Sequence, residues 1–118
     1  TAVFDEDMKL CLTIGDGESP PLLMRMAQRT PIKVGREDPN ATQRPDVDLV
    51  PYGGYQMGIS RQHAEVELVG KRAFIRDLGS SNGTFLNGVQ VDPHETHQLR
   101  DGDVVLLGRM RLEVTYRR

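Results

Sequence analysis

The sequence predicts an all-β fold, a β-sandwich of about eleven strands. Short runs of apolar or alternating residues recur along the 118 residues, separated by Gly, Pro, Asn and Asp, as is typical of β-sandwiches. Almost no stretch favours a helix. Residues 64–68 show the alternation well, because Ala64, Val66 and Leu68 share one face of a strand. Glu65 and Glu67 share the other face, so this strand is predicted to be half-buried.

The strands follow from these runs in chain order. We expect them at residues 9–14, 22–27, 32–34, 47–49, 63–69, 73–77, 84–86, 89–91, 97–99, 104–107 and 111–116. Turn residues separate them: Asn87-Gly88 predicts a tight hairpin, and Asp16-Gly17, Gly70-Lys71 and Asp101-Gly102 mark other reversals, which favours a meander. The longest irregular stretch, residues 37–58, is expected to be functional or mobile.

Length and composition indicate one domain, residues 1–118 with its core in about 10–117. A chain of this size buries roughly two thirds of the surface that its unfolded form exposes. It begins at Thr1 rather than Met, so we expect a module cut from a longer protein. The single cysteine, Cys11, lies in an apolar run and is expected to be a small buried hydrophobe. With no apolar run long enough for a membrane span or a secretory signal, a cytoplasmic location is predicted.

The charge pattern argues against some classes of partner and favours another. A formal net charge of −2 argues against a nucleic-acid binder, which would carry a basic surface. Only three of the 15 basic residues are lysines, and the guanidinium fork of arginine suits phosphate. No metal or other cofactor is predicted, because His94 and His97 have no third ligand nearby in the sequence and the acidic clusters lack the calcium-loop pattern.

Three short segments carry the functional prediction: Gly35-Arg36, Ser60-Arg61-Gln62-His63 and Ser81-Asn82-Gly83-Thr84. Each lies where a predicted strand meets a loop, with roughly twenty residues between neighbours, and together they offer two guanidinium groups and a hydroxyl for phosphate oxygens. The glycines around residues 79–84 do not indicate a nucleotide site, because the Lys and the following helix of a P-loop are missing.

In their order and spacing these segments resemble the forkhead-associated (FHA) domain, over about residues 10–117. The resemblance implies an eleven-stranded sandwich whose loops converge at one end, and a module that binds phosphothreonine peptides in a pocket that accommodates the threonine methyl. It implies that Arg36, Ser60 and Arg61 bind the phosphate, that Ser81 lies at the phosphothreonine pocket, and that Asn82 bonds the peptide main chain. We expect structural roles for Gly35, His63, Gly83, Asn87 and Gly88.

The leading hypothesis is therefore a phosphothreonine-dependent binding module, not an enzyme, that recruits a partner phosphorylated by a Ser/Thr kinase. An alternative is a phosphate-independent interaction or oligomerisation domain that uses the surface around Tyr52 and Tyr55. Hydrolysis through Ser60 and His63 is a distant third, because the two residues point to opposite faces of an extended strand and no third group orients them. Neither nucleic acid nor a membrane is predicted as a partner.

Overall fold

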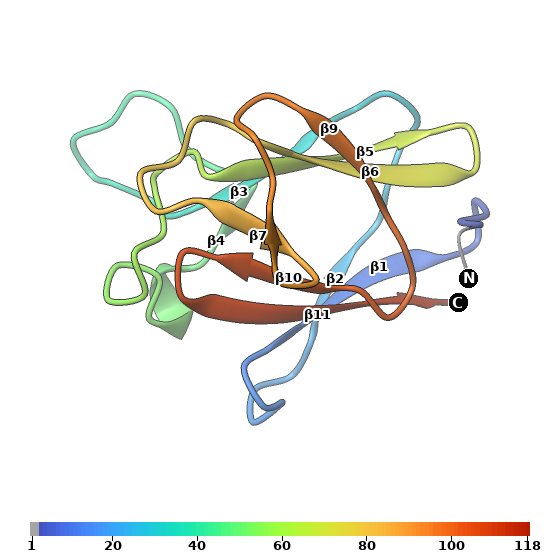
Figure 1. Ribbon diagram of the computed structural model, residues 1–118. Coiled ribbons are helices and arrows are strands. Elements are labelled where there is room, and N and C mark those ends of the chain that lie inside the picture. The colour runs from blue at the N-terminus through green and yellow to red at the C-terminus, as the bar shows by residue number, and fades with distance from the viewer. Residues whose placement is uncertain (1–2) are drawn as a thin grey trace.

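The computed structural model describes residues 3–118 and confirms the all-β fold, a sandwich of two sheets (Figure 1). The six-stranded sheet runs in the order β2 (Leu22–Met24), β1 (Lys9–Ile14), β11 (Met110–Arg117), β10 (Val104–Leu107), β7 (Thr84–Leu86) and β8 (Val89–Gln90). The five-stranded sheet runs in the order β4 (Val47–Asp48), β3 (Ile32–Gly35), β5 (Ala64–Val69), β6 (Arg72–Asp77) and β9 (Thr96–Leu99). A 3₁₀ turn, Val50–Tyr52, follows β4.

All eleven predicted strands are present, and β2 is the one that departs most from its predicted bounds. It was expected over residues 22–27 but ends at Met24. The chain then crosses to the other sheet, where Gln28 forms an isolated bridge with Leu68. The Gln28 side chain donates to the carbonyl of Gly70 at 2.6 Å and accepts from its amide at 2.8 Å, so the crossing segment is fixed to the end of β5.

The meander prediction is only partly right. Neighbouring strands do form hairpins, as in β5–β6, β7–β8 and β10–β11, and the Asn87-Gly88 hairpin has the positive φ values of a tight turn, 49° and 85°. However, β1 pairs with β11, β7 pairs with β10, and β3 lies parallel to β4. Turn residues report only local reversals, so they could not reveal these long-range pairings.

The core lies between the two sheets, and β5 shows how the alternating pattern builds it. Ala64, Val66 and Leu68 are at most 3% exposed and belong to the apolar core. Glu65 lies on the other face, yet it is only 7% exposed because its carboxylate pairs with the guanidinium of Arg76 on β6. The outer face of this strand is thus more buried than alternation predicts. Cys11 is buried and free.

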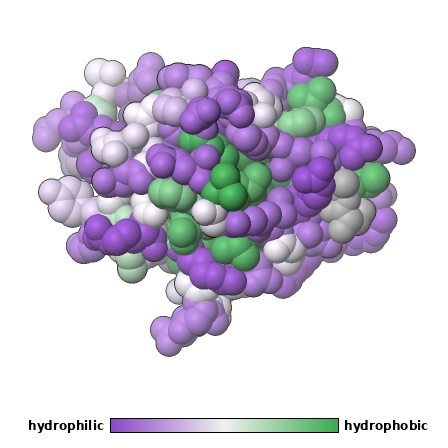
Figure 2. Space-filling view, viewed as in Figure 1, coloured by the Kyte–Doolittle hydropathy of each residue, from purple (hydrophilic) through white to green (hydrophobic). Residues whose placement is uncertain are grey.

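The loops that carry the three segments gather at one end of the sandwich, at the left in Figure 1, together with the turn between β10 and β11. The first described residues and the C-terminus lie at the opposite end, where Arg118 forms an ion pair with Asp5. In the view of Figure 2 the loop end carries mainly hydrophilic side chains. Among residues 3–118, no helix is long and apolar enough to cross a membrane.

Candidate functional site

The end of β3 is pressed against the second segment. A Cβ added to Gly35 would lie only 2.0 Å from the carbonyl oxygen of Arg61, so any side chain at this position would push the end of β3 away from the loop that precedes β5. The next amide, that of Arg36, donates to the carbonyls of both Ser60 and Arg61 at 3.2 Å. Glycine at residue 35 therefore brings the first two segments into backbone contact.

The guanidinium of Arg36 is held rather than free. Its Nε donates to the carbonyl of Ile59 at 2.8 Å, and its Cζ lies 5.0 Å from the centroid of the Tyr55 ring. The side chain is therefore fixed at two points and does not project freely into solvent. Its two terminal nitrogens have no hydrogen-bond partner within residues 3–118, so they remain available to a ligand.

Arg61 is held in a similar way by a carboxylate. Its Nε lies 2.7 Å from Oδ2 of Asp38, in the loop after β3. The Arg61 side chain is 58% exposed, whereas that of Asp38 is only 13% exposed, so the acid is the fixed partner of the pair. In the described part of the chain the terminal nitrogens of Arg61 have no partner either. Sequence reasoning missed Asp38, which lies 23 positions before Arg61.

His63 joins two segments through its ring. Its Nδ1 accepts the amide hydrogen of Ser60 at 3.0 Å, so the ring proton is on Nε2, which donates to the carbonyl of Gly83 at 2.9 Å. The side chain is fully buried, and burial lowers its pKa, although the bond to Gly83 and the charge of Asp77 act the other way. Both ring nitrogens are bonded to backbone and neither bonds the Ser60 hydroxyl, which argues against the hydrolase hypothesis.

Two further bonds tie the third segment to the second segment and to the residues just before it. The Ser81 amide donates to the Ser60 hydroxyl at 3.0 Å, and the Asn82 side chain donates to the carbonyl of Gly58 at 2.9 Å. The carbonyl of Gly83 also accepts the amide of Gly108 at 2.9 Å, which adds the turn between β10 and β11 to the cluster. The structure thus brings together Arg36, Ser60 and Arg61, which the resemblance assigns to the phosphate, and Ser81 and Asn82, which it assigns to the phosphothreonine pocket and the peptide main chain.

A family model for the FHA domain matches residues 32–108, which is more than half of the chain. The chain belongs to the FHA domain family. This match includes all three segments of the site and the long loop between β3 and β5.

Relatives and solved structures agree with this assignment. Protein FraH of Nostoc sp. is 41% identical over 71 residues, 60% of this chain, and FhaA of Mycobacterium tuberculosis is 42% identical over 57 residues, 48% of this chain. The chain spans only 24% and 10% of the lengths of these two relatives.

Among solved structures, the FHA domain of an Arabidopsis thaliana hypothetical protein has a TM-score of 0.72 and 28% identity, covering 100% of this chain and 92% of that one. A structure from a study of phosphothreonine-dependent FHA domain interactions has a TM-score of 0.68 and 30% identity, covering 91% and 95%.

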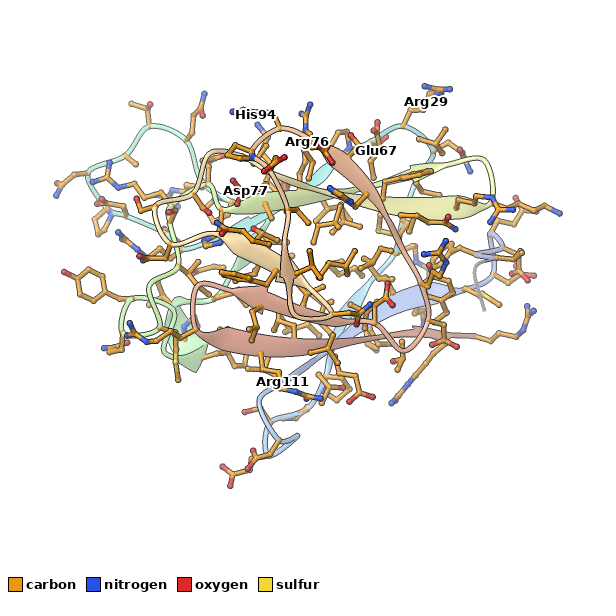
Figure 3. All side chains as sticks on the ribbon, viewed as in Figure 1. Arg29, Glu67, Arg76, Asp77, His94 and Arg111 are labelled. Atoms are coloured by element: carbon orange, nitrogen blue, oxygen red, sulfur yellow. The ribbon has the colours of Figure 1, made fainter. Side chains whose placement is uncertain are left out.

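Asp77 is a site residue that sequence reasoning missed. It ends β6 at the loop end of this FHA domain (Figure 3), is 2% exposed, and accepts from the amides of Gly79 and Ser80 at 2.9 and 3.0 Å. The hydroxyls of Ser80 and Thr84 donate to its other oxygen at 2.6 Å each. Burial alone would raise its pKa, but these hydrogen bonds outweigh burial and lower it. The available signal was an Asp at a strand end just before a Gly-Ser turn.

Asn87 and Gly88 lie outside this cluster. The Asn87 side chain accepts from the Val104 amide at 2.9 Å and donates to Asp103 at 3.0 Å, so it fixes the β7–β8 hairpin to β10. The exposed His94 lies beside the cluster, because its amide donates to the Asp77 carbonyl at 2.8 Å, and the half-buried His97 pairs with Glu95. Within the described residues, no group of three or more His, Cys, Asp or Glu side chains could hold a metal ion.

Proposed function

We propose that this FHA domain binds phosphothreonine peptides, and that it recruits a partner protein after a Ser/Thr kinase has acted on it in the cytoplasm. FHA domains as a family bind such peptides. The observation that carries the proposal for this chain is the pair of guanidinium groups beside Ser60. Arg36 and Arg61 are each held through Nε, and within residues 3–118 the terminal nitrogens of each have no hydrogen-bond partner.

A phosphate group suits this arrangement. It carries about −1.5 to −2 charges at pH 7 and three strong acceptor oxygens. The free nitrogens of Arg36 and Arg61 supply charge-assisted bonds, and the Ser60 hydroxyl, which accepts from the Ser81 amide, still has its own hydrogen to donate. A few such bonds at about 1.5–3 kcal/mol each, less about 2–5 kcal/mol for ordering the peptide, leave a net of about 5–8 kcal/mol. That corresponds to a Kd of roughly 1–200 μM.

The third segment supplies contacts for the peptide rather than for the phosphate. Ser81 and Asn82 are exposed, while their positions are fixed by the bonds to Ser60 and Gly58. The Asn82 side chain keeps its carbonyl oxygen and one N–H for a peptide main chain. A hollow beside Arg61 offers room for flanking residues of the ligand. It is lined by Asn40, Ala41, Thr42, Gln43 and Gln62.

The alternative of a phosphate-independent interaction surface gains no support from the two tyrosines. Tyr52 is half-buried and packs against the core, whereas Tyr55 is 70% exposed and faces the Arg36 guanidinium. The two rings therefore do not form one apolar patch. The ring of Tyr55 belongs instead to the surroundings of the proposed phosphate site.

A peptide titration tests the proposal. A degenerate phosphothreonine peptide library is titrated into the domain by calorimetry or fluorescence polarisation, beside its unphosphorylated twin and a phosphoserine counterpart. We expect the phosphothreonine peptides to bind and the unphosphorylated twins not to bind. The phosphoserine peptides should bind more weakly than the phosphothreonine peptides, because a buried methyl contributes on the order of 1 kcal/mol. Equal binding of phosphorylated and unphosphorylated peptides would reject the proposal in favour of the phosphate-independent alternative. Equal binding of phosphothreonine and phosphoserine would reject only the threonine preference.

A further inference from the structure

Tyr55 is the most conspicuous residue of the long loop. Its side chain is 70% exposed, so it contributes little to the core. Its position is nevertheless well fixed, because the carbonyl of Leu49 accepts the amides of Tyr52 and Gly54 at 3.1 and 2.9 Å. The Tyr55 carbonyl accepts the amide of Gly58 at 3.2 Å, which closes the turn on the other side.

The two glycines before Tyr55 make this tight turn possible. Gly53 has a φ of +84°, and a Cβ added to Gly54 would lie 2.7 Å from the carbonyl oxygen of Leu49. The Gly54 carbonyl then accepts the amide of Ile59 at 2.9 Å. The loop is therefore bonded at both ends around an aromatic ring that it leaves at the surface, a placement that core packing does not explain.

The ring faces the guanidinium of Arg36. The 5.0 Å between Cζ and the ring centroid is within the range of a cation–π contact. Ile59 holds the Nε of the same guanidinium at 2.8 Å. A hydrogen bond at one nitrogen and a ring against the guanidinium together restrict the rotation of the arginine and leave its terminal nitrogens open.

We propose that Tyr55 is a positioning residue for phosphate recognition: its ring holds the Arg36 guanidinium in the orientation that presents both terminal nitrogens to the phosphate. The inference rests on the proposed function and adds a residue outside the three segments. The positioning role requires the aromatic face of Tyr55 and not its hydroxyl. Phenylalanine at residue 55 should therefore preserve peptide binding, and leucine should not. An aromatic ring that only filled space would be replaced equally well by leucine.

The test is a substitution series at residue 55, with a single phosphothreonine peptide selected from the library as the probe. We expect Tyr55→Phe to bind as the parent does, and Tyr55→Leu to raise Kd about two- to five-fold, the change expected from losing a surface cation–π contact. Leu23→Ala is the matched control, because Leu23 is also exposed, by 58%. It lies on β2, the edge strand of the six-stranded sheet opposite β8. Thermal melts of all variants should agree within a few degrees.

A second measurement, without ligand, separates positioning of Arg36 from direct contact with the peptide. The Hε–Nε NMR signal of Arg36, assigned by its loss in Arg36→Lys, should shift when leucine removes the ring and stay in place with phenylalanine. If Tyr55→Leu weakens binding while this signal stays unchanged, Tyr55 contacts the peptide itself and the positioning role is wrong.

The remaining outcomes also decide the question. A Tyr55→Phe variant as weak as Tyr55→Leu assigns the effect to the hydroxyl and overturns the inference. Equal Kd values for the parent and Tyr55→Leu overturn it as well, and in both cases phosphothreonine binding stands. If the parent itself binds no phosphothreonine peptide, the proposed function fails and the positioning role fails with it.

Discussion

The two walls of the site are built in different ways. The buried wall consists of the side chains of His63, Asp77 and Thr84, which lie inside the protein: His63 and Thr84 are fully buried and Asp77 is 2% exposed. The exposed wall consists of residues 36–58, and its contacts to the site lie near the surface. They are the Asp38–Arg61 pair and the Tyr55 ring beside Arg36.

Because of this difference, we expect substitutions in the two walls to change different properties, stability in one case and peptide binding in the other. A buried polar group that loses its partner costs the full desolvation of the group left behind, whereas an exposed contact is replaced by water. Substitutions in the buried wall should therefore unfold the domain or distort the whole site. Substitutions in the exposed wall should change phosphate binding while the fold persists.

Arg36→Ala provides the largest expected effect on the exposed wall. Loss of two charge-assisted bonds to phosphate, at about 1.5–3 kcal/mol each, should weaken phosphothreonine-peptide binding by at least about 100-fold. The free energy of unfolding should change by only about 0.5–1 kcal/mol, because one hydrogen bond to Ile59 and a surface contact to Tyr55 are lost. Calorimetric titration and chemical denaturation measure the two quantities.

Arg109→Ala is the matched control for Arg36→Ala. Arg109 is exposed at the same end of the molecule, and its side chain donates to the carbonyl of Gln56. It should bind the peptide as the parent does. Normal peptide binding by a folded Arg36→Ala variant would remove Arg36 from the phosphate site.

Asp77→Asn provides the corresponding effect on the buried wall. The substitution keeps the shape but turns an NH₂ group toward the amides and hydroxyls that now donate to the carboxylate. Unsatisfied buried donors should lower the free energy of unfolding by about 2–3 kcal/mol. Chemical denaturation measures this loss, with Asp16→Asn, at an exposed turn, as the control. A folded variant with the parent's stability would contradict the idea that the carboxylate holds residues 79–84.

The comparison also shows what the sequence could predict. Strand positions depend on local alternation and turn residues, so all eleven were found, and β2 alone was clearly too long because its end is set by a crossing to the other sheet. The pairing of β1 with β11 and the parallel β3–β4 pair depend on contacts distant in the sequence. No local pattern reports them.

The same division applies to the site. The motif residues were readable because their types and spacing are characteristic, and Asp77 had a local signal in the Gly-Ser turn that follows it. Asp38 and Tyr55 had none. They reach Arg61 and Arg36 only through the shape of residues 37–58, which the bonds to the Leu49 carbonyl and the glycine turn at 53–54 determine.

Measuring stability as a function of pH tests the role of the buried wall. Burial lowers the pKa of His63 in the folded state, so the unfolded chain binds a proton that the folded one does not. The contribution of neutral, buried His63 to the free energy of unfolding is fully present above the pKa of the unfolded chain, about 6.5. It is lost as pH falls from there toward the pKa of the folded state. The lowered pKa of Asp77 acts in the same direction, but only below about pH 3.8. The contributions of His63 and Asp77 to the pH dependence of stability therefore fall in separate pH ranges.

Denaturation at pH 7.5 and 5.5 should accordingly show a less stable parent at the lower pH. His63→Gln, although less stable overall because it disturbs the bonds to Ser60 and Gly83, should lose less between these two values. Equal losses in the parent and in His63→Gln would mean that His63 is not the source of the pH dependence.

The smallest effect is expected from Asp38→Asn, on the exposed wall. Asp38 holds the Nε of Arg61, but its carboxylate also places a negative charge where a dianionic phosphate would approach. Surface ion pairs contribute up to about 1 kcal/mol, so stability should hardly change and peptide binding should become tighter by no more than about five-fold. The gain should shrink at high salt, which screens exposed charges. Glu37→Gln, which breaks the neighbouring surface pair with Arg44, is the matched control and should leave Kd unchanged. Weaker binding by Asp38→Asn would show that orienting Arg61 outweighs the repulsion, and Asp38 would then act toward Arg61 as we propose that Tyr55 acts toward Arg36.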